Sequence, residues 1–367
     1  MKISIATLLV LLSLPTSPAQ NDYQVLRGEA QGFARVVPGI PVEFPRDHMA
    51  HPSFRIEWWY ITANLLDDSG NPWGLQWTLF RNSLDPQADS GGWQSNQLWM
   101  AHAAISSPEG HQFEQRFARG GIGQAGVSAG VSNVAAHGNF SAWLDDWQWR
   151  SDGLQLFPSN LKFSVAGQQV DMRLESSSPW VTHGDRGYSQ KSVQGQASYY
   201  YSQPHIQISG TIRTGNKTVS LSGSAWLDRE WSSAPLAQNQ PGWDWFALHF
   251  DDGNKLMLYR LRENNGDHWL SGSWISKDGS KQHLRRDEIE LIPIRTREIK
   301  IGGKPAIKLP LEWTIKLPGL DRQWRVKALY DEQWMATRFA YWEGVVLVED
   351  ASGQSTGVGY MELTGYD

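Results

Sequence analysis

The sequence predicts an all-β protein that consists of two tandem antiparallel barrels. Short apolar segments recur between turns rich in Gly, Asn and Asp, which is typical of β-sandwiches and β-barrels. The 367 residues include 20 tryptophans, and such large side chains need either a deep core or a roomy interior. One hairpin pattern also occurs twice, once near the start of each half of the chain.

The first 19 residues are expected to be a secretory signal peptide. Lys2 precedes an apolar run from Ile3 to Leu14, and small residues follow up to Ala19. The run is too short to span a bilayer as a helix, so we expect cleavage near Ala19 and export to the periplasm or the medium. The absence of cysteine excludes disulfides and thiol chemistry. A net charge of −5 spread along the chain argues against nucleic-acid binding.

The first barrel is expected over residues 48–232, after an extended lead-in over residues 20–47 that contains several prolines. Its opening hairpin runs over Phe54–Asn82 and turns at the polar stretch Asp67–Asn71. Further alternating segments follow and end in the tryptophan-rich stretch Gly223–Trp231.

The second barrel is expected over residues 242–367, after a linker over residues 233–241. The linker is polar, contains two prolines and shows no periodicity, as connections between domains often do. The first strand of this half, Gly242–Phe250, leads through an Asp-Asp-Gly-Asn turn into another alternating strand.

The repeated hairpin pattern relates the two halves. Trp59–Asn71 aligns with Trp243–Asn254 without gaps as far as the paired aspartates, and a slip of one residue in the turn follows. Each copy then continues into an alternating strand that ends near an arginine, Arg81 or Arg260. Because each copy opens its half of the chain, we interpret the halves as barrels of related build.

Charged residues next to the first tryptophans predict a buried ion pair. Side chains two residues apart in a strand point the same way, so Arg55, Glu57 and Trp59 share a face. Inside a barrel such a pair either ties strands together or belongs to a site. We favour the structural interpretation, and assign Arg229 of the later tryptophan-rich stretch to the same ion-pair set.

Four carboxyl groups next to tryptophans are candidate acid catalysts: Glu57, Asp228, Glu230 and Asp244. Apolar surroundings raise the pKa of a carboxyl group, as a proton donor at neutral pH requires. Adding water to an isolated alkene needs such an acid, aromatic faces beside the tertiary cation, and a placed water molecule. Alternation puts Asp228 and Glu230 on one strand face and Arg229 on the opposite one.

Aromatic side chains at a barrel mouth can hold one apolar ligand. The candidate ligand-binding residues are the aromatics around these carboxyl groups and one strand histidine: Trp58, Trp59, Tyr60, His102, Trp226, Trp231, Trp243 and Trp245. Most histidines occur singly along the chain, so we expect no metal site. The stretch Gly353–Gly357 matches G-x-S-x-G, but it is a short turn between strands and no histidine follows it, which argues against a serine nucleophile.

Four motifs in order resemble the AttH-like family: Glu57–Tyr60, Trp226–Trp231, Tyr341–Gly344 and the terminal Gly359–Tyr366. This family is related to the carotenoid 1,2-hydratases and is often described as predicted secreted hydrolases. The resemblance extends from about His48 to the C-terminus. It implies two consecutive lipocalin-like barrels, of which the first ends with the second motif.

The resemblance implies an exported lipocalin-like protein that binds a hydrophobic lipid or isoprenoid-type ligand without a cofactor. The alternatives are a hydratase or hydrolase that uses a buried carboxylate, and an accessory protein with an ABC-transporter permease as its partner. Many members have a histidine where this chain has Arg229, and a guanidinium does not release a proton at working pH. A proton-transfer role at that position is therefore not expected here.

Overall fold

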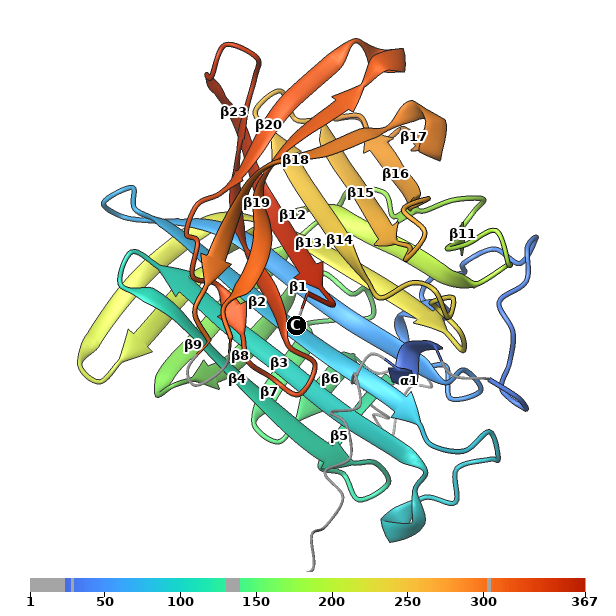
Figure 1. Ribbon diagram of the computed structural model, residues 1–367. Coiled ribbons are helices and arrows are strands. Elements are labelled where there is room, and N and C mark those ends of the chain that lie inside the picture. The colour runs from blue at the N-terminus through green and yellow to red at the C-terminus, as the bar shows by residue number, and fades with distance from the viewer. Residues whose placement is uncertain (1–23, 28–29, 130–138, 302–304, 367) are drawn as a thin grey trace, which may run out of the picture.

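The computed structural model describes residues 24–27, 30–129, 139–301 and 305–366 (Figure 1). The predicted signal peptide, residues 1–19, lies outside the described residues. Within the described part, no helix is long and apolar enough to cross a membrane. The predicted all-β fold is confirmed. Helical structure in the described ranges is limited to short turns: α1 (Gln24–Arg27), η1 (Arg46–His48), η2 (Gly92–Gln94), η3 (Arg286–Glu288) and η4 (Pro318–Leu320).

The strands form two antiparallel sheets, and each sheet is continuous in sequence. The first sheet contains β1 (Ile56–Asp67), β2 (Pro72–Ser83), β3 (Gln97–Ser107), β4 (Gly110–Arg119), β5 (Ala125–Ala129), β6 (Phe140–Leu144), β7 (Trp147–Ser151), β8 (Ser159–Val165), β9 (Gln168–Glu175), β10 (Val181–Thr182), β11 (Tyr188–Gln190), β12 (Ala197–Thr214) and β13 (Lys217–Ser232). The second contains β14 (Gly242–Phe250), β15 (Lys255–Arg262), β16 (Trp269–Ile275), β17 (Lys281–Leu284), β18 (Glu290–Ile299), β19 (Ile307–Leu317), β20 (Arg322–Ala328), β21 (Trp334–Met335), β22 (Tyr341–Glu349) and β23 (Ser355–Thr364).

The first sheet is a nearly closed barrel and the second is a half-barrel. In Figure 1 the yellow-to-red strands of the second sheet lie across the blue and teal strands of the first. The strand order confirms a relation between the halves, because β4-β3-β2-β1-β13-β12 has its counterpart in β17-β16-β15-β14-β23-β22. In each half the first strand pairs with the last: β1 with β13, and β14 with β23.

The structural register of the repeat differs from the sequence alignment. The alignment pairs Trp59 with Trp243, but Trp59 points into the core of the first barrel, whereas Trp243 packs on the cluster between the sheets. The cross-strand pairs show the equivalence: Glu57 lies opposite Arg81, and Asp244 lies opposite Arg260. The alignment is wrong because it pairs Asp67 with Asp251, whereas the hydrogen bonds of the two turns make Asp67 equivalent to Phe250: each closes its turn with an asparagine, Asn71 or Asn254. A shift of one residue reverses every face.

The three largest apolar clusters of the described residues lie inside each sheet and between the sheets. The cluster between the sheets is formed by outward-facing residues of β1, β12 and β13 packed on β14, β15, β22 and β23. Gly74 permits this close approach, since a Cβ added there would lie 2.3 Å from Val345 Cγ2. The sheets therefore share an apolar interface.

The predicted linker, residues 233–241, lies between the last strand of the first sheet and the first strand of the second. It is a packed segment: Leu236 belongs to the cluster between the sheets, and Gln240 is fully buried. The Gln240 amide donates to the backbone carbonyl of Lys191 at 2.9 Å. Hydrogen bonds of this kind fix the segment in place.

Candidate functional site

The alternation of β13 divides the stretch Trp226–Trp231 between two environments. Asp228 and Glu230 face the second sheet, and Arg229 is buried inside the first barrel. This confirms the predicted division of faces. The sharp change of chemistry along consecutive residues follows from the pleat of the strand, which points neighbouring side chains in opposite directions.

A pocket of about 140 Å³ lies between the two sheets. Its walls are mainly apolar and aromatic, with a few polar groups that converge from both sheets. The residues that line it include Trp58, Tyr60, His102, Lys191, Tyr200, Asp228, Glu230, Trp243, Trp245, Tyr341 and Glu362. An apolar cavity with convergent polar groups is the usual form of a small-molecule site.

Asp228 is the most extensively hydrogen-bonded carboxyl group of the pocket. Tyr200 Oη donates to Asp228 Oδ2 at 2.5 Å, and the indole Nε1 of Trp226 donates to Oδ1 at 2.6 Å. The hydroxyl of Ser202 donates to the same carboxyl group. Burial raises the pKa of Asp228 to about 7, although the three donors oppose that shift. Asp228 can therefore exchange a proton near neutral pH.

Glu230 differs from Asp228 because it has a cationic partner. Lys191 Nζ lies 2.8 Å from Glu230 Oε1, and the hydroxyl of Ser198 donates to the same oxygen. Burial alone would lower the pKa of Lys191, but the attraction of Glu230 outweighs burial and the pKa is raised. The ammonium group also lies 4.1 Å from the ring centroid of Tyr259. This part of the pocket wall therefore carries two opposite charges and no net charge.

Two further carboxyl groups come from the second sheet. Glu362 of β23 lines the pocket and accepts a hydrogen bond from Trp243 Nε1 at 2.5 Å. Glu343 lies directly opposite it on β22 and accepts a hydrogen bond from the hydroxyl of Tyr60. Burial raises the pKa of Glu362 to about 8, and burial together with the nearby charge of Glu362 raises the pKa of Glu343 well above its usual value.

His102 lines the pocket and is a neutral group there. Its Nδ1 lies 2.9 Å from the hydroxyl of Tyr341, and burial lowers the pKa of His102 to about 3. Its Nε2 is buried without a hydrogen-bond partner among the described residues. A buried polar atom of this kind is suited to contact a polar group of a ligand.

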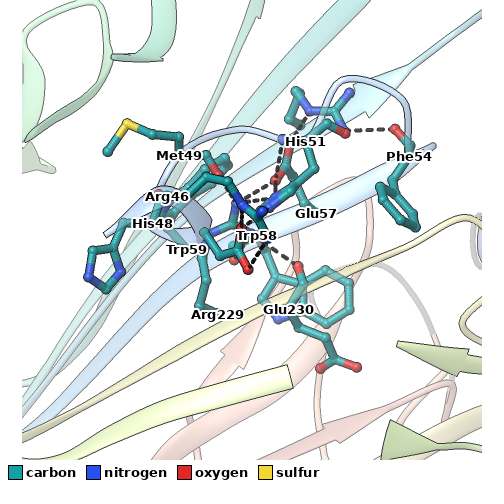
Figure 2. A network of polar contacts seen from close by, with 12 residues as sticks. Arg46, His48, Met49, His51, Phe54, Glu57, Trp58, Trp59, Arg229 and Glu230 are labelled. Carbon is teal, nitrogen blue, oxygen red and sulfur yellow. Dashed lines mark hydrogen bonds and ion pairs between the residues drawn. The ribbon is translucent and has the colours of Figure 1, made fainter. Parts of the chain in front are cut away.

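Glu57 lies on the other face of β1, inside the first barrel, in the network of Figure 2. The guanidinium groups of Arg81 and Arg229 both donate to its carboxylate, and His51 donates through its backbone N–H at 2.8 Å. Burial would raise the pKa of Glu57, but the two arginine charges outweigh burial and hold it well below its usual value. Figure 2 shows the side chain of Glu230 pointing away from this cluster.

This geometry corrects two predictions about Glu57. It is not an acid catalyst, because a carboxylate held by two arginines does not hold a proton at neutral pH. Its ion pair with Arg229 is confirmed, but the second arginine is Arg81 of β2, which sequence reasoning missed. Arg55 lies just ahead of β1, where its backbone N–H donates to Ser233 Oγ at 3.2 Å. Arg81 could have been found from the hairpin, since it stands opposite Glu57.

Asp244 has the same structural role in the second sheet and is not in the pocket. Arg260 Nε lies 2.7 Å and Arg262 Nη1 lies 2.6 Å from its carboxylate, and the hydroxyl of Tyr366 donates to it at 2.7 Å. The predicted catalytic assignment of Asp244 is therefore replaced by a structural one. The equivalence with Glu57 extends to the cross-strand arginine.

The predicted ligand-binding aromatics also divide by strand face. Trp58, Tyr60, His102, Trp243 and Trp245 line the pocket. Trp59 is buried in the first barrel, where the guanidinium of Arg229 lies 3.7 Å from its ring centroid. Trp231 stacks on His51 at 4.0 Å between ring centroids, and Trp226 supports Asp228. These three do not line the pocket.

The polar pocket residues that sequence reasoning missed include Lys191, Tyr200 and Glu362. Glu362 lies in the terminal motif Gly359–Tyr366, where alternation places Tyr360 and Glu362 on one face. That spacing was a usable signal. Lys191 lies between β11 and β12, and no local sequence pattern predicts that it lines the pocket.

Comparisons with known proteins agree with this architecture. A family model described as AttH-like matches residues 35–366. A crystal structure of an AttH protein from Nitrosomonas europaea is 35% identical, with a TM-score of 0.76, and the match covers 91% of this chain and 100% of that one. Among curated proteins, the sequence has no match.

Two more distant structures share the fold. Kievitone hydratase from Nectria haematococca has a TM-score of 0.65 at 14% identity, over 91% of this chain and 96% of that one. CghA, solved with Sch210972, has a TM-score of 0.50 at 13% identity, over 86% of this chain and 89% of that one.

Proposed function

Because the chain belongs to the AttH-like family, we propose that it binds an apolar isoprenoid-type ligand between its sheets and adds water to a double bond of that ligand. The observation that carries this proposal is Asp228. It is a buried carboxyl group on the pocket wall whose oxygens accept only neutral donors among the described residues. A structural carboxylate such as Glu57 is paired with arginine, and Asp228 is not.

The size of the pocket limits which part of a ligand it takes. A cavity of about 140 Å³ is close to the ~150 Å³ cavity that holds benzene in an engineered protein core. One isoprene unit or one ring fits such a space. A longer ligand would place its terminal unit between the sheets and leave the remainder outside.

The walls supply what alkene hydration needs. The proton comes from a carboxyl group, and the indole rings of Trp58 and Trp245 lie beside the pocket, where their electron-rich faces stabilise a tertiary cation. Water then attacks the cation and loses its proton to a carboxylate. The product is a tertiary alcohol, and no cofactor is required.

The fold likeness to kievitone hydratase supports the barrel arrangement but not the substrate, since the identity is 14%. Plain ligand binding is the second candidate, and the apolar aromatic walls favour it as well. The two candidates differ in whether Asp228 transfers a proton.

The test uses geraniol, whose terminal double bond is trisubstituted, in isotopically labelled water. We expect the wild-type protein to bind geraniol and to form the labelled tertiary alcohol. Asp228→Asn should keep the binding, followed by tryptophan fluorescence, and lose the product. Asp171→Asn, an exposed change in the Lys162 ion pair of β8 and β9, is the control. Binding without any product from the wild-type protein would leave ligand binding as the function and exclude hydration of this alkene.

A further inference from the structure

Glu230 and Glu362 occupy equivalent positions in the two sheets and face one pocket. Each lies on the last strand of its sheet, opposite a tryptophan of the first strand: Glu230 opposite Trp58, and Glu362 opposite Trp245. On their other sides, Glu230 neighbours Tyr200, whereas Glu362 neighbours the carboxyl group of Glu343. The repeat therefore brings carboxyl groups to the pocket from both sheets.

The two glutamates differ in their partners. Lys191 pairs with Glu230 at 2.8 Å. Among the described residues neither Glu362 nor Glu343 has an ion pair with lysine or arginine, and Glu343 Oε2 is buried without a hydrogen-bond partner. Two buried carboxyl groups directly opposite each other on neighbouring strands cannot both carry a charge at low cost. Protons must therefore remain on this pair near neutral pH.

Glu362 and Asp228 also differ in how many donors they accept. Asp228 accepts hydrogen bonds from Tyr200, Trp226 and Ser202, which stabilise its charged form. Glu362 accepts one from the residues that the structure describes, namely from Trp243. The other titratable groups around the pocket are the Glu230–Lys191 pair, Glu343, neutral His102 and buried tyrosine hydroxyls. Asp228 is thus the better proton acceptor of the two, and Glu362 the better donor.

We infer that Glu362 is the catalytic proton donor and Asp228 the proton acceptor in the hydration proposed above, on which this inference rests. Glu362 transfers its carboxyl proton to the less substituted alkene carbon, and the π electrons form the new C–H bond. Water attacks the resulting tertiary cation, and its surplus proton passes to Asp228. A proton then returns from Asp228 to Glu362 through solvent, so that alkene plus water yields alcohol with both groups restored.

The substrate class follows from the charges that this step leaves behind. Once Glu362 has given up its proton, two carboxylates and the indole faces surround the cation, so the pocket favours ligands that acquire positive charge. An alkene with a doubly substituted carbon at one end meets that requirement, because its protonation yields a tertiary cation.

The first test is Glu362→Gln, which preserves the shape of the side chain. We expect geraniol affinity within about 2-fold of wild type and hydration reduced by about 100-fold or more. The loss of activity that accompanies deprotonation of Glu362 on the alkaline side of the rate–pH profile should also disappear. Glu298→Gln, an exposed glutamate of β18, is the matched control and should change neither.

A second test does not depend on turnover. The probe is a geraniol analogue in which a protonated tertiary amine replaces the carbon that would carry the charge. Its binding at pH 7 should release protons, because a cation beside Glu362 lowers the pKa of that carboxyl group; calorimetry in buffers of different ionisation enthalpy measures the release. Glu362→Gln should lose most of it, and Glu298→Gln none.

The outcomes separate the two proposals. If the wild-type protein hydrates geraniol and Glu362→Gln does so at the same rate and with the same pH profile, Glu362 is not the donor and hydration stands. If the amine releases as many protons from Glu362→Gln as from wild type, the inference is also overturned. If no variant and no wild-type protein forms alcohol, hydration itself fails, whatever the proton release.

Discussion

Asp228 and Arg229 are consecutive in β13 and serve opposite faces of the same sheet. Asp228 lies in the pocket with hydrogen bonds from Tyr200, Ser202 and Trp226, while Arg229 lies inside the first barrel against Glu57 and Trp59. Arg229 therefore belongs to the interior of the first barrel and does not line the pocket.

Removing the charge of Glu57 should destabilise the fold. Glu57→Gln leaves Arg81 and Arg229 buried without their counter-charge, and breaking such a pair costs about 3–5 kcal/mol of unfolding free energy. Urea denaturation measures the loss. Glu298→Gln, whose partner Lys308 is exposed, should change stability by less than about 0.5 kcal/mol. Unchanged stability together with lost turnover would contradict the structural role of Glu57.

Asp244→Asn should behave in the same way. It removes the charge between Arg260 and Arg262, and because these arginines are slightly more exposed than Arg81 we expect a loss of about 3 kcal/mol. The melting temperature and the geraniol affinity of the folded protein are the measurements. A stable variant with abolished binding would return Asp244 to the list of site residues.

Two neighbouring tryptophans should respond in opposite ways. Trp59→Ala opens a cavity in the first barrel and should cost about 3–5 kcal/mol of stability. Trp58→Ala removes a partly buried wall of the pocket and should weaken geraniol binding about 10-fold, or ~1.4 kcal/mol. Each variant is the control for the other. If the two substitutions weakened geraniol binding equally, the assignment of Trp58 to the pocket and of Trp59 to the barrel core would be wrong.

Stability should depend on pH through Glu362. Its pKa is raised in the folded protein from 4.5 to about 8, so the folded state holds a proton that the unfolded state has lost between these values. The contribution of Glu362 to the free energy of unfolding is complete below about pH 4, is lost as the pH rises toward 8, and remains absent above pH 8. Asp228 also contributes stability at low pH, and this contribution is lost as the pH rises to about 7, where its carboxyl group loses its proton in the folded state.

The histidines oppose this trend on the acid side. Burial lowers the pKa of His48 and of His102 to about 3, so their contribution is lost as pH falls below 6.5. The difference between Glu362→Gln and wild type isolates the glutamate: the variant should gain relative stability, by at least about 1 kcal/mol, between pH 5 and pH 9. Denaturation at several pH values measures it, and parallel curves would exclude a proton on Glu362.

Export stays a prediction of the first residues. If residues 1–19 are removed, the N-terminus of the protein recovered from the exported fraction should begin near Gln20. N-terminal sequencing decides the point. Retention of Met1 in that fraction would be the contrary result. The ABC-transporter partner likewise stays a prediction.

Local sequence patterns were sufficient for the fold class and for much of the first wall of the pocket. Strand alternation placed Asp228 and Glu230 together and Arg229 behind them, and turn chemistry located the opening hairpins. The four ordered motifs identified the family and the order of the two halves. These features depend on neighbours in the chain, which a sequence records directly.

Only the tertiary structure decided which of the carboxyl groups line the pocket and which are paired with arginine. Glu57 and Asp244 stand beside tryptophans as Asp228 does, yet both point into a sheet interior and meet arginines from an adjacent strand. Glu362 lines the same pocket as Asp228 because the two sheets pack on each other. The sequence by itself determined which side chains share a face of each strand. The packing of the sheets determined which face holds carboxylates paired with arginine and which face encloses the pocket, because burial and ion pairing depend on residues far apart in the chain.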